Sequence, residues 1–175
     1  KKKIKRFDTI ICCTGSGKKI SSDEINKKVL EKYFNVNFYT VSNLISSYLK
    51  IYNKQKTSII VISSIASKKI IEAPIGYSIS KLSLDYLVKI LAKNLAKNQI
   101  NLNLISPGNI LIKDNSWDKR LKKNKTKTKR YIAENVPTKS FISASEIFNI
   151  IQMISKPDSK NITGSDFIVD GGQSL

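Results

Sequence analysis

The chain has 175 residues, of which 41% are hydrophobic, and a formal net charge of +18. Its length and apolar content suffice for one domain with a buried core, and no apolar run approaches the roughly 18 to 20 residues that cross a bilayer. Histidine is absent, which excludes Ser-His-Asp and Cys-His catalysis and all His-ligated metal sites. We expect a cytoplasmic protein without a signal segment or a membrane partner.

The positive charge is spread over the whole chain, because lysine is abundant in the predicted helices, strands and loops alike. Such a distribution is typical of a general composition bias, whereas a nucleic-acid site would gather its cations into one patch. We therefore do not expect a nucleic-acid partner.

The two cysteines, Cys12 and Cys13, are adjacent in an apolar run. Neighbouring side chains of a strand point to opposite faces, so a disulfide between them is not expected. They do not form a metal-ligand pattern, and we predict no metal site. Both are interpreted as buried small hydrophobes.

The first predicted element is a buried strand at 7–13, FDTIICC, which ends in the loop TGSGKK. A helical pattern follows from Ser21, an N-cap candidate with acidic residues just after it. Apolar residues then recur at helical spacing as far as Leu49, which indicates one helix, or two with a bend near 33–36. The run TSIIVISS at 57–64 is short and β-branched, and predicts a second buried strand.

A long helix is predicted over 73–99, followed by a third strand, INLNLISPG, at 100–108. The segment 109–137 is long, basic and weakly patterned, and is interpreted as a mobile insertion with short helical pieces. A helix with a Ser cap is predicted over 143–156, and a last short strand, DFIVDGG, over 166–172.

The predicted order is β-α-β-α-β-loop-α-β within a single domain, 1–175. Alternating buried strands and amphipathic helices indicate an α/β fold, a parallel sheet with helices on both faces. In such sheets the ligand crevice lies at the carboxyl ends of the strands. The strand ends here read CCTGSG, SSIAS and SPGNI, so two carry glycine and one carries a serine pair.

Tyr77 and Lys81 lie four residues apart on the predicted long helix, which places them on one face, about 5–6 Å apart at Cβ. A nearby ammonium favours the phenolate and lowers the pKa of a tyrosine, which makes such a pair a plausible proton donor and acceptor. Ser64, at the mouth of the preceding strand, could hydrogen-bond the same substrate oxygen. Tyr-x-x-x-Lys alone is a weak signal in a lysine-rich chain, and the plain alternative is two surface residues of a helix.

The order of five motifs resembles the short-chain dehydrogenase/reductase family over nearly the whole chain. DTIICCTG at 8–15 takes the place of that family's Asp-x-x-x-Asn-Asn-Ala-Gly strand end, and FNVNF at 34–38 that of its Asn-bearing helix. VISSIAS and GYSISK match the catalytic Ser and the Tyr-Lys motif. ISPGNI resembles the Pro-Gly motif beside the nicotinamide, and ITGSDFIVDGG at 162–172 resembles the last strand.

The resemblance implies a Rossmann-like oxidoreductase that uses NAD or NADP and acts on an alcohol or ketone. Its catalytic residues would be Asn37, Ser64, Tyr77 and Lys81. Tyr77 would exchange the proton at the substrate oxygen, and Ser64 would position the substrate carbonyl. Lys81 would lower the pKa of Tyr77 and hold the nicotinamide ribose. Asn37 would hold a water of the proton relay.

The resemblance also implies a set of cofactor contacts and a state of assembly. The implied cofactor-binding residues are Gly15, Tyr77, Lys81, Pro107, Gly108 and Ile110. In the family, the helices that would carry Asn37 and Tyr77 pack between subunits, so a homo-oligomer is expected.

The chain departs from the family pattern at its start. The family's Thr-Gly-x-x-x-Gly-x-Gly turn, which holds the cofactor pyrophosphate at a helix N-terminus, has no counterpart, and neither has the strand that selects NAD or NADP. About two βαβ units are missing. We interpret the chain as the C-terminal part of an enzyme; the alternative is a catalytically silent Rossmann-like remnant that acts through protein contacts, with its first strand as an open edge.

The basic insertion holds nine Lys or Arg over 113–130 against Asp114 and Asp118. In the family the segment after Pro-Gly covers the substrate, so a basic lid could attract an anionic substrate. The alternative is a solvated loop that shares the general bias of the chain. Two smaller departures weaken the cofactor site: Cys12-Cys13-Thr14-Gly15 replaces Asn-Asn-Ala-Gly, and Ile112 replaces a frequent Thr.

Overall fold

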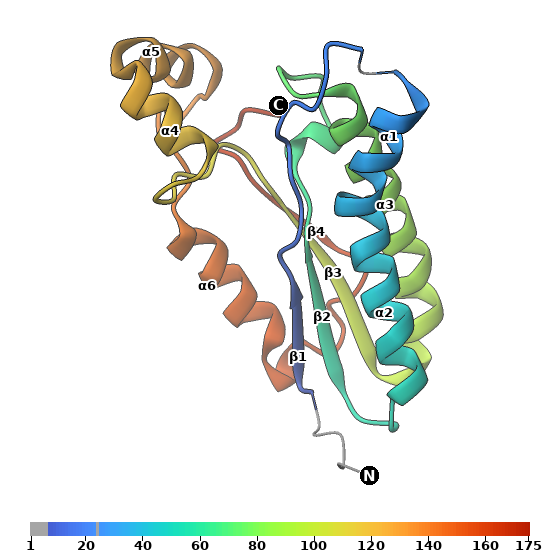
Figure 1. The fold of residues 1–175 in the computed structure, drawn as a ribbon. Helices are drawn as coiled ribbons and strands as arrows, with labels where there is room; N and C mark the ends of the chain where they lie inside the picture. The colour runs from blue at the N-terminus through green and yellow to red at the C-terminus, as the bar shows by residue number, and fades with distance from the viewer. Residues whose placement is uncertain (1–6, 24) are drawn as a thin grey trace.

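Residues 7–23 and 25–175 are described by a computed structural model; the basic start of the chain and Glu24, part of the predicted acidic helix start, lie outside them. Four parallel strands form one sheet in the order β1-β2-β3-β4 (Figure 1). They are β1 (Thr9–Cys12), β2 (Thr57–Ile62), β3 (Ile100–Pro107) and β4 (Asp166–Val169). The predicted α/β class with a parallel sheet is thus confirmed.

Helices cover both faces of the sheet (Figure 1). On one face lie α1 (Lys27–Phe34), the π-helical η1 (Asn35–Tyr39), α2 (Thr40–Ile51) and α3 (Ile75–Leu95). On the other face lies α6 (Ala144–Ser155), whose capping box joins Ser143 and Glu146. Short 3₁₀ turns are η2 (Ile65–Ser67), η3 (Ala96–Asn98) and η4 (Pro157–Ser159).

The core is formed by the two middle strands and the helix faces packed on them. All eight residues of β3 are buried, as are the first five of β2. Asn101 and Asn103 of β3 are buried too, because their amides donate to the carbonyl oxygens of Ser159 and Ile162. Val41, Ile45 and Leu84 fill one side of the sheet, and Ile105, Ile142 and Ile154 fill the other. Among the described residues, β1 pairs with β2 alone, so its second edge is open.

Two local expectations were wrong. The first helix begins at Lys27 with Asn26 as its cap, because Ser21 accepts a bond from Asp23 N within a local turn instead. Of the two cysteines, Cys12 is buried and Cys13 is exposed, since Cys13 lies just beyond the end of β1. No helix in the described ranges is long and apolar enough to cross a membrane.

The insertion after β3 folds into two short helices, α4 (Ser116–Lys123) and α5 (Lys125–Asn135). Each begins at an asparagine cap, Asn115 for α4 and Asn124 for α5, which accepts bonds from the first backbone N–H groups. The two helices stand beyond the carboxyl ends of the strands, on the α6 side of the molecule (Figure 1). The short helical pieces predicted for 109–137 are therefore present.

Candidate active site

The carboxyl ends of the parallel strands meet at one edge of the sheet and bring the predicted site residues to it. Gly15 follows β1, Ser64 follows β2, and Pro107 and Gly108 close β3. Tyr77 and Lys81 come from the first two turns of α3, which packs beside β3. This is the edge at which open parallel α/β sheets bind their ligands.

The side chains of Ser64 and Tyr77 lie close together, near enough for the serine hydroxyl to act on the pKa of the tyrosine. Ser64 is also the N-cap of η2, where its Oγ accepts from Ala66 N at 3.2 Å. The cap fixes the serine hydroxyl at the mouth of β2. The structure therefore brings two predicted catalytic hydroxyls together across two elements.

Burial raises the pKa of Tyr77 above its usual value near 10; the Ser64 hydroxyl opposes this rise and the charge of Asp85 adds to it. This direction is opposite to the one implied by the Lys81 neighbour. The physical reason is that desolvation disfavours the phenolate, while Lys81 directs its ammonium to a backbone carbonyl. Tyr77 is also close to the loop after β1, since a Cβ at Gly17 would lie 3.6 Å from its ring.

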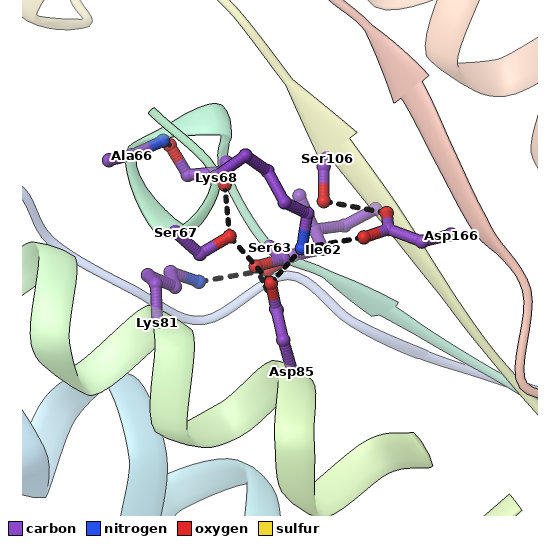
Figure 2. A network of polar contacts seen from close by, with 10 residues as sticks. Ile62, Ser63, Ala66, Ser67, Lys68, Lys81, Asp85, Ser106 and Asp166 are labelled. Carbon is purple, nitrogen blue, oxygen red and sulfur yellow. Dashed lines mark hydrogen bonds and ion pairs between the residues drawn. The ribbon is translucent and has the colours of Figure 1, made fainter. Parts of the chain in front are cut away.

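Lys81 is 3% exposed, and its Nζ donates to the carbonyl oxygen of Ile62 at 2.8 Å (Figure 2). Burial lowers the pKa of Lys81 to about 8, although Asp85 and Cys13 act in the opposite direction. An amine with such a pKa can give and take protons near neutral pH.

Asn37 is fully buried in the π-helical turn η1 and holds the loop after β1. Its Oδ1 accepts from Ser16 N at 2.8 Å, and its Nδ2 donates to Ser16 O at 3.2 Å and Tyr33 O at 3.0 Å. The side chain is thus committed to backbone groups. Gly15 lies between Asn37 and Lys81: a Cβ there would come within 3.0 Å of Asn37 Oδ1 and 3.1 Å of Lys81 Nζ, so only glycine fits without displacement.

The Pro-Gly segment is fixed by the last strand and the turn after it. Gly108 N donates to Val169 O at 2.9 Å, and a Cβ at Gly108 would lie 3.0 Å from the Asp170 backbone. Ile110 forms a parallel bridge with Ile142. These contacts hold the backbone of 107–110 at the same edge as Tyr77.

Sequence reasoning missed a group of charged residues behind Ser64. Asp85, on α3, accepts bonds from Ser63, Ser67 and Lys68, and Lys68 also pairs with Asp166 of β4 (Figure 2). One signal was available: Asp85 falls on the apolar stripe of its helix, next to Leu84, where a charge needs a buried partner.

The described residues fit one half of a dinucleotide better than the other. Backbone groups at 107–110, with Tyr77 and Lys81, form an edge suited to a nicotinamide and its ribose. A phosphate turn needs a glycine loop that opens directly into a helix. In the described part of the chain, the glycine loop after β1 is instead followed by non-helical backbone until Lys27.

A cavity of about 450 Å³ lies between the insertion helices and Glu72, in the segment between η2 and α3. The Trp117 and Tyr131 rings are 5.4 Å apart, and the Arg120 guanidinium stands 4.7 Å above the Trp117 ring. Arg120, Lys123 and Lys127 line this cavity together with a single carboxylate, Glu72.

The parallel sheet, with Ser64, Tyr77 and Lys81 gathered at its carboxyl edge, defines a Rossmann-like α/β protein. The family model described as enoyl-(acyl carrier protein) reductase matches residues 1–174. The chain therefore belongs to the short-chain dehydrogenase/reductase family.

Three of the curated relatives are 30% identical to this chain. A glucose 1-dehydrogenase from Gluconobacter oxydans aligns over 174 residues, 97% of this chain and 63% of its own length. A 3-oxoacyl-[acyl-carrier-protein] reductase from Buchnera aphidicola aligns over 138 residues, 79% of this chain and 53% of its own length. The chain thus spans between about half and two thirds of these relatives.

Solved structures share the fold. An L-sorbose reductase from Gluconobacter frateurii, complexed with NADPH and L-sorbose, superposes with a TM-score of 0.85 at 24% identity, over 95% of this chain and 66% of that one. RhlG from Pseudomonas aeruginosa, in complex with NADP, superposes with a TM-score of 0.84 at 21% identity, over 97% of this chain and 67% of that one.

Proposed function

We propose that this chain is the catalytic portion of an oxidoreductase that uses NAD or NADP and interconverts an alcohol and a ketone. The observation that carries the proposal is the proximity of the Ser64 and Tyr77 side chains at the carboxyl edge of the sheet, with the buried ammonium of Lys81 one helical turn away. Membership of the short-chain dehydrogenase/reductase family supports it.

The proposed division of work follows from where each group lies. Ser64 hydrogen-bonds the substrate oxygen and holds it against Tyr77. The Tyr77 hydroxyl gives its proton to that oxygen during reduction and regains it in the reverse direction. Lys81, whose pKa lies near 8, then returns a proton toward Tyr77 or stabilises its phenolate. Tyr77 lies in the first turn of a 21-residue helix, where the helix dipole also favours negative charge.

The bound nicotinamide would supply or accept the hydride. Residues Tyr77, Lys81, Pro107, Gly108 and Ile110 would hold its nicotinamide half, and Gly15 would let it approach Asn37 and Lys81 closely. Asn37 fixes the loop that borders this space. We propose that the pyrophosphate contacts come from sequence beyond the described residues, so the isolated chain binds the cofactor weakly.

We propose further that segment 109–137 serves as a lid and that the substrate carries an anionic group. Lys122 and Arg130 are paired with acidic neighbours, whereas Arg120, Lys123 and Lys127 form no ion pair with a described residue and line the cavity. Three cations against Glu72 leave a positive site beside two aromatic rings, which suits a small carboxylate or phosphate. We also propose a cytoplasmic homo-oligomer built on the exposed apolar face of α3.

The experiment combines cofactor titration with a Tyr77→Phe variant. NADH or NADPH fluorescence should report binding up to millimolar concentration, and Tyr77→Phe should keep that binding while ketone reduction falls roughly 10²-fold or more, because the proton donor is lost. Tyr39→Phe is the control, since Tyr39 is 49% exposed and has no role in the proposed reaction or assembly.

Absence of binding by both cofactors at millimolar concentration, in the longest native product, would overturn the enzyme assignment for that product. The alternative role through protein contacts would then be the better account. Equal turnover by the wild type and Tyr77→Phe would overturn the role given to Tyr77.

A further inference from the structure

Asp85 is a buried carboxylate one helical turn beyond Lys81, and its side chain is 4% exposed. Three donors point to it: the Ser63 hydroxyl, the Ser67 hydroxyl at 2.5 Å and the Lys68 ammonium (Figure 2). Acceptance of three bonds satisfies a buried carboxylate, which is otherwise costly to desolvate.

Two of these donors flank Ser64 in the chain. Ser63 immediately precedes it, and Ser67 follows it by three residues and also lies 2.6 Å from the Ser64 carbonyl oxygen. Asp85 therefore ties both sides of the Ser64 turn to α3, the helix that carries Tyr77 and Lys81. A displacement of this carboxylate would move the serine hydroxyl relative to the tyrosine.

Lys68 extends the contact to the last strand. Its Nζ lies 2.6 Å from Asp166 Oδ2, and Asp166 Oδ1 accepts from Ser106 Oγ of β3 at 2.7 Å. The group thus joins η2, α3, β3 and β4 with two carboxylates and one ammonium, so its net charge is negative. The pairing partners raise the pKa of Lys68 in spite of its partial burial, which keeps that ammonium charged.

Asp85 also acts on the reacting groups through its charge. The titratable residues around Tyr77 and Lys81 are Cys13 after β1, Tyr33 on α1, Lys68 after η2 and Asp85 on α3 itself. Of the two carboxylates bridged by Lys68, Asp85 lies on the helix that carries Tyr77, and its charge adds to the rise in the pKa of Tyr77 that burial causes. A negative charge beneath the pair keeps protons on both Tyr77 and Lys81.

We propose that Asp85, with Lys68 as its counter-ion, is a positioning residue that holds the Ser64 turn against α3 and Tyr77 and places a buried charge one helical turn from Lys81. The inference rests on the proposed function for its catalytic meaning, but its electrostatic part does not require turnover. A purely structural network would change stability when cut and leave the titration of Tyr77 where it was.

The test is a titration of the cofactor-free protein labelled with ¹³Cζ-tyrosine. The chain has seven tyrosines, and the Tyr77→Phe variant identifies the Tyr77 signal by its loss. Asp85→Asn should lower the Tyr77 midpoint by about one pH unit or more, because one charge within about 12 Å exerts an effect of that size at an effective dielectric constant near 20. Asp166→Asn is the matched control and should shift that midpoint by less than half as much.

If the Lys68→Met variant folds, its Tyr77 midpoint should rise, because the negative charge of Asp85 is no longer offset by the Lys68 ammonium. The decision rests on the two Asp→Asn variants, since Lys68→Met leaves two buried carboxylates unpaired. Equal midpoint shifts in Asp85→Asn and Asp166→Asn, or none in either, would overturn the proposal. In an active full-length protein, Asp85→Asn should also move the acidic limb of kcat/KM; a titration shift without any turnover would instead count against the proposed reaction alone.

Discussion

Lys81 is a cation held where water barely reaches it. Burial lowers the pKa of Lys81 to about 8, so the charged amine reduces the stability of the folded protein at lower pH. The carbonyl of Ile62 and the nearby Asp85 recover part of that cost. A lysine that is easily deprotonated serves proton exchange with Tyr77 better than a fully solvated one.

This burial predicts a pH-dependent stability difference between the wild type and Lys81→Met. The unfolded lysine binds its proton up to about pH 10.5 and the folded one only to about 8, so the penalty is complete below pH 8 and vanishes as pH rises to 10.5. In urea unfolding, the free energy of unfolding of the wild type should rise by up to about 3 kcal/mol relative to that of Lys81→Met between pH 8 and pH 10.5. The exposed Lys93→Met serves as control, and a difference that stays flat with pH would contradict the prediction.

At this scale, residues with a local pattern were predictable and residues without one were not. Ser64, Tyr77 and Lys81 lie at fixed spacings after a strand and within one helix, so the sequence alone could place them at the same edge. Lys68 and Asp166 are far apart in the chain and meet only because β4 lies beside β3. The raised pKa of Tyr77 was also out of reach, since it depends on the extent of burial.

At the scale of elements, α3 is the piece that organises the site. Its buried side packs Leu84 and Val88 on the sheet and carries Lys81 and Asp85. The helix can approach α1 closely because Gly76 faces the Tyr33 ring, where a Cβ would lie 2.3 Å from a ring carbon. The strand positions and the helices on both faces could be predicted from the short β-branched runs. The π-helical turn at 35–39 could not, because the sequence indicated only a bend near 33–36.

The outer side of α3 predicts self-association. Ile79, Leu82, Tyr86 and Ile90 recur every three or four residues and are 42%, 55%, 69% and 46% exposed. Such a stripe normally packs against another element. Leu82→Glu should shift the protein toward monomer in sedimentation velocity, whereas Ile70→Glu, at a fully exposed loop position, should not. A monomeric wild type, or equal behaviour of both variants, would contradict this.

At the scale of the whole molecule, the large net charge of +18 matters most at the proposed lid, where Arg120, Lys123 and Lys127 gather without an ion pair to a described residue. Trp117 is the only tryptophan of the chain and lies in the lid cavity, so its fluorescence reports on that place. An aromatic 2-oxo acid should quench it more strongly than its methyl ester does. Arg120→Gln or Lys123→Gln should weaken the acid's binding roughly fivefold or less each, and added salt should weaken it further.

The control for the lid is Lys129→Gln, because Lys129 is exposed on the same helices but does not line the cavity. Equal binding of the acid and the ester, or an equal loss of binding in Lys129→Gln, would contradict the prediction. The basic segment would then be a solvated surface without a binding role, the alternative that the sequence left open. The sequence could indicate a basic segment here, but not that two helices would enclose a cavity with it.

The exposed Cys13 gives the site a chemical handle. Of the chain's two thiols, Cys12 is buried in β1, whereas Cys13 is exposed. Partial burial raises the pKa of the Cys13 thiol, and the nearby Lys81 opposes this rise. A maleimide should therefore attach at one position, at the border of the space proposed for the nicotinamide. A ligand bound in that space should slow the modification of Cys13. The modification rate therefore measures how far the space is occupied, and ligands can be ranked by it before any substrate is known.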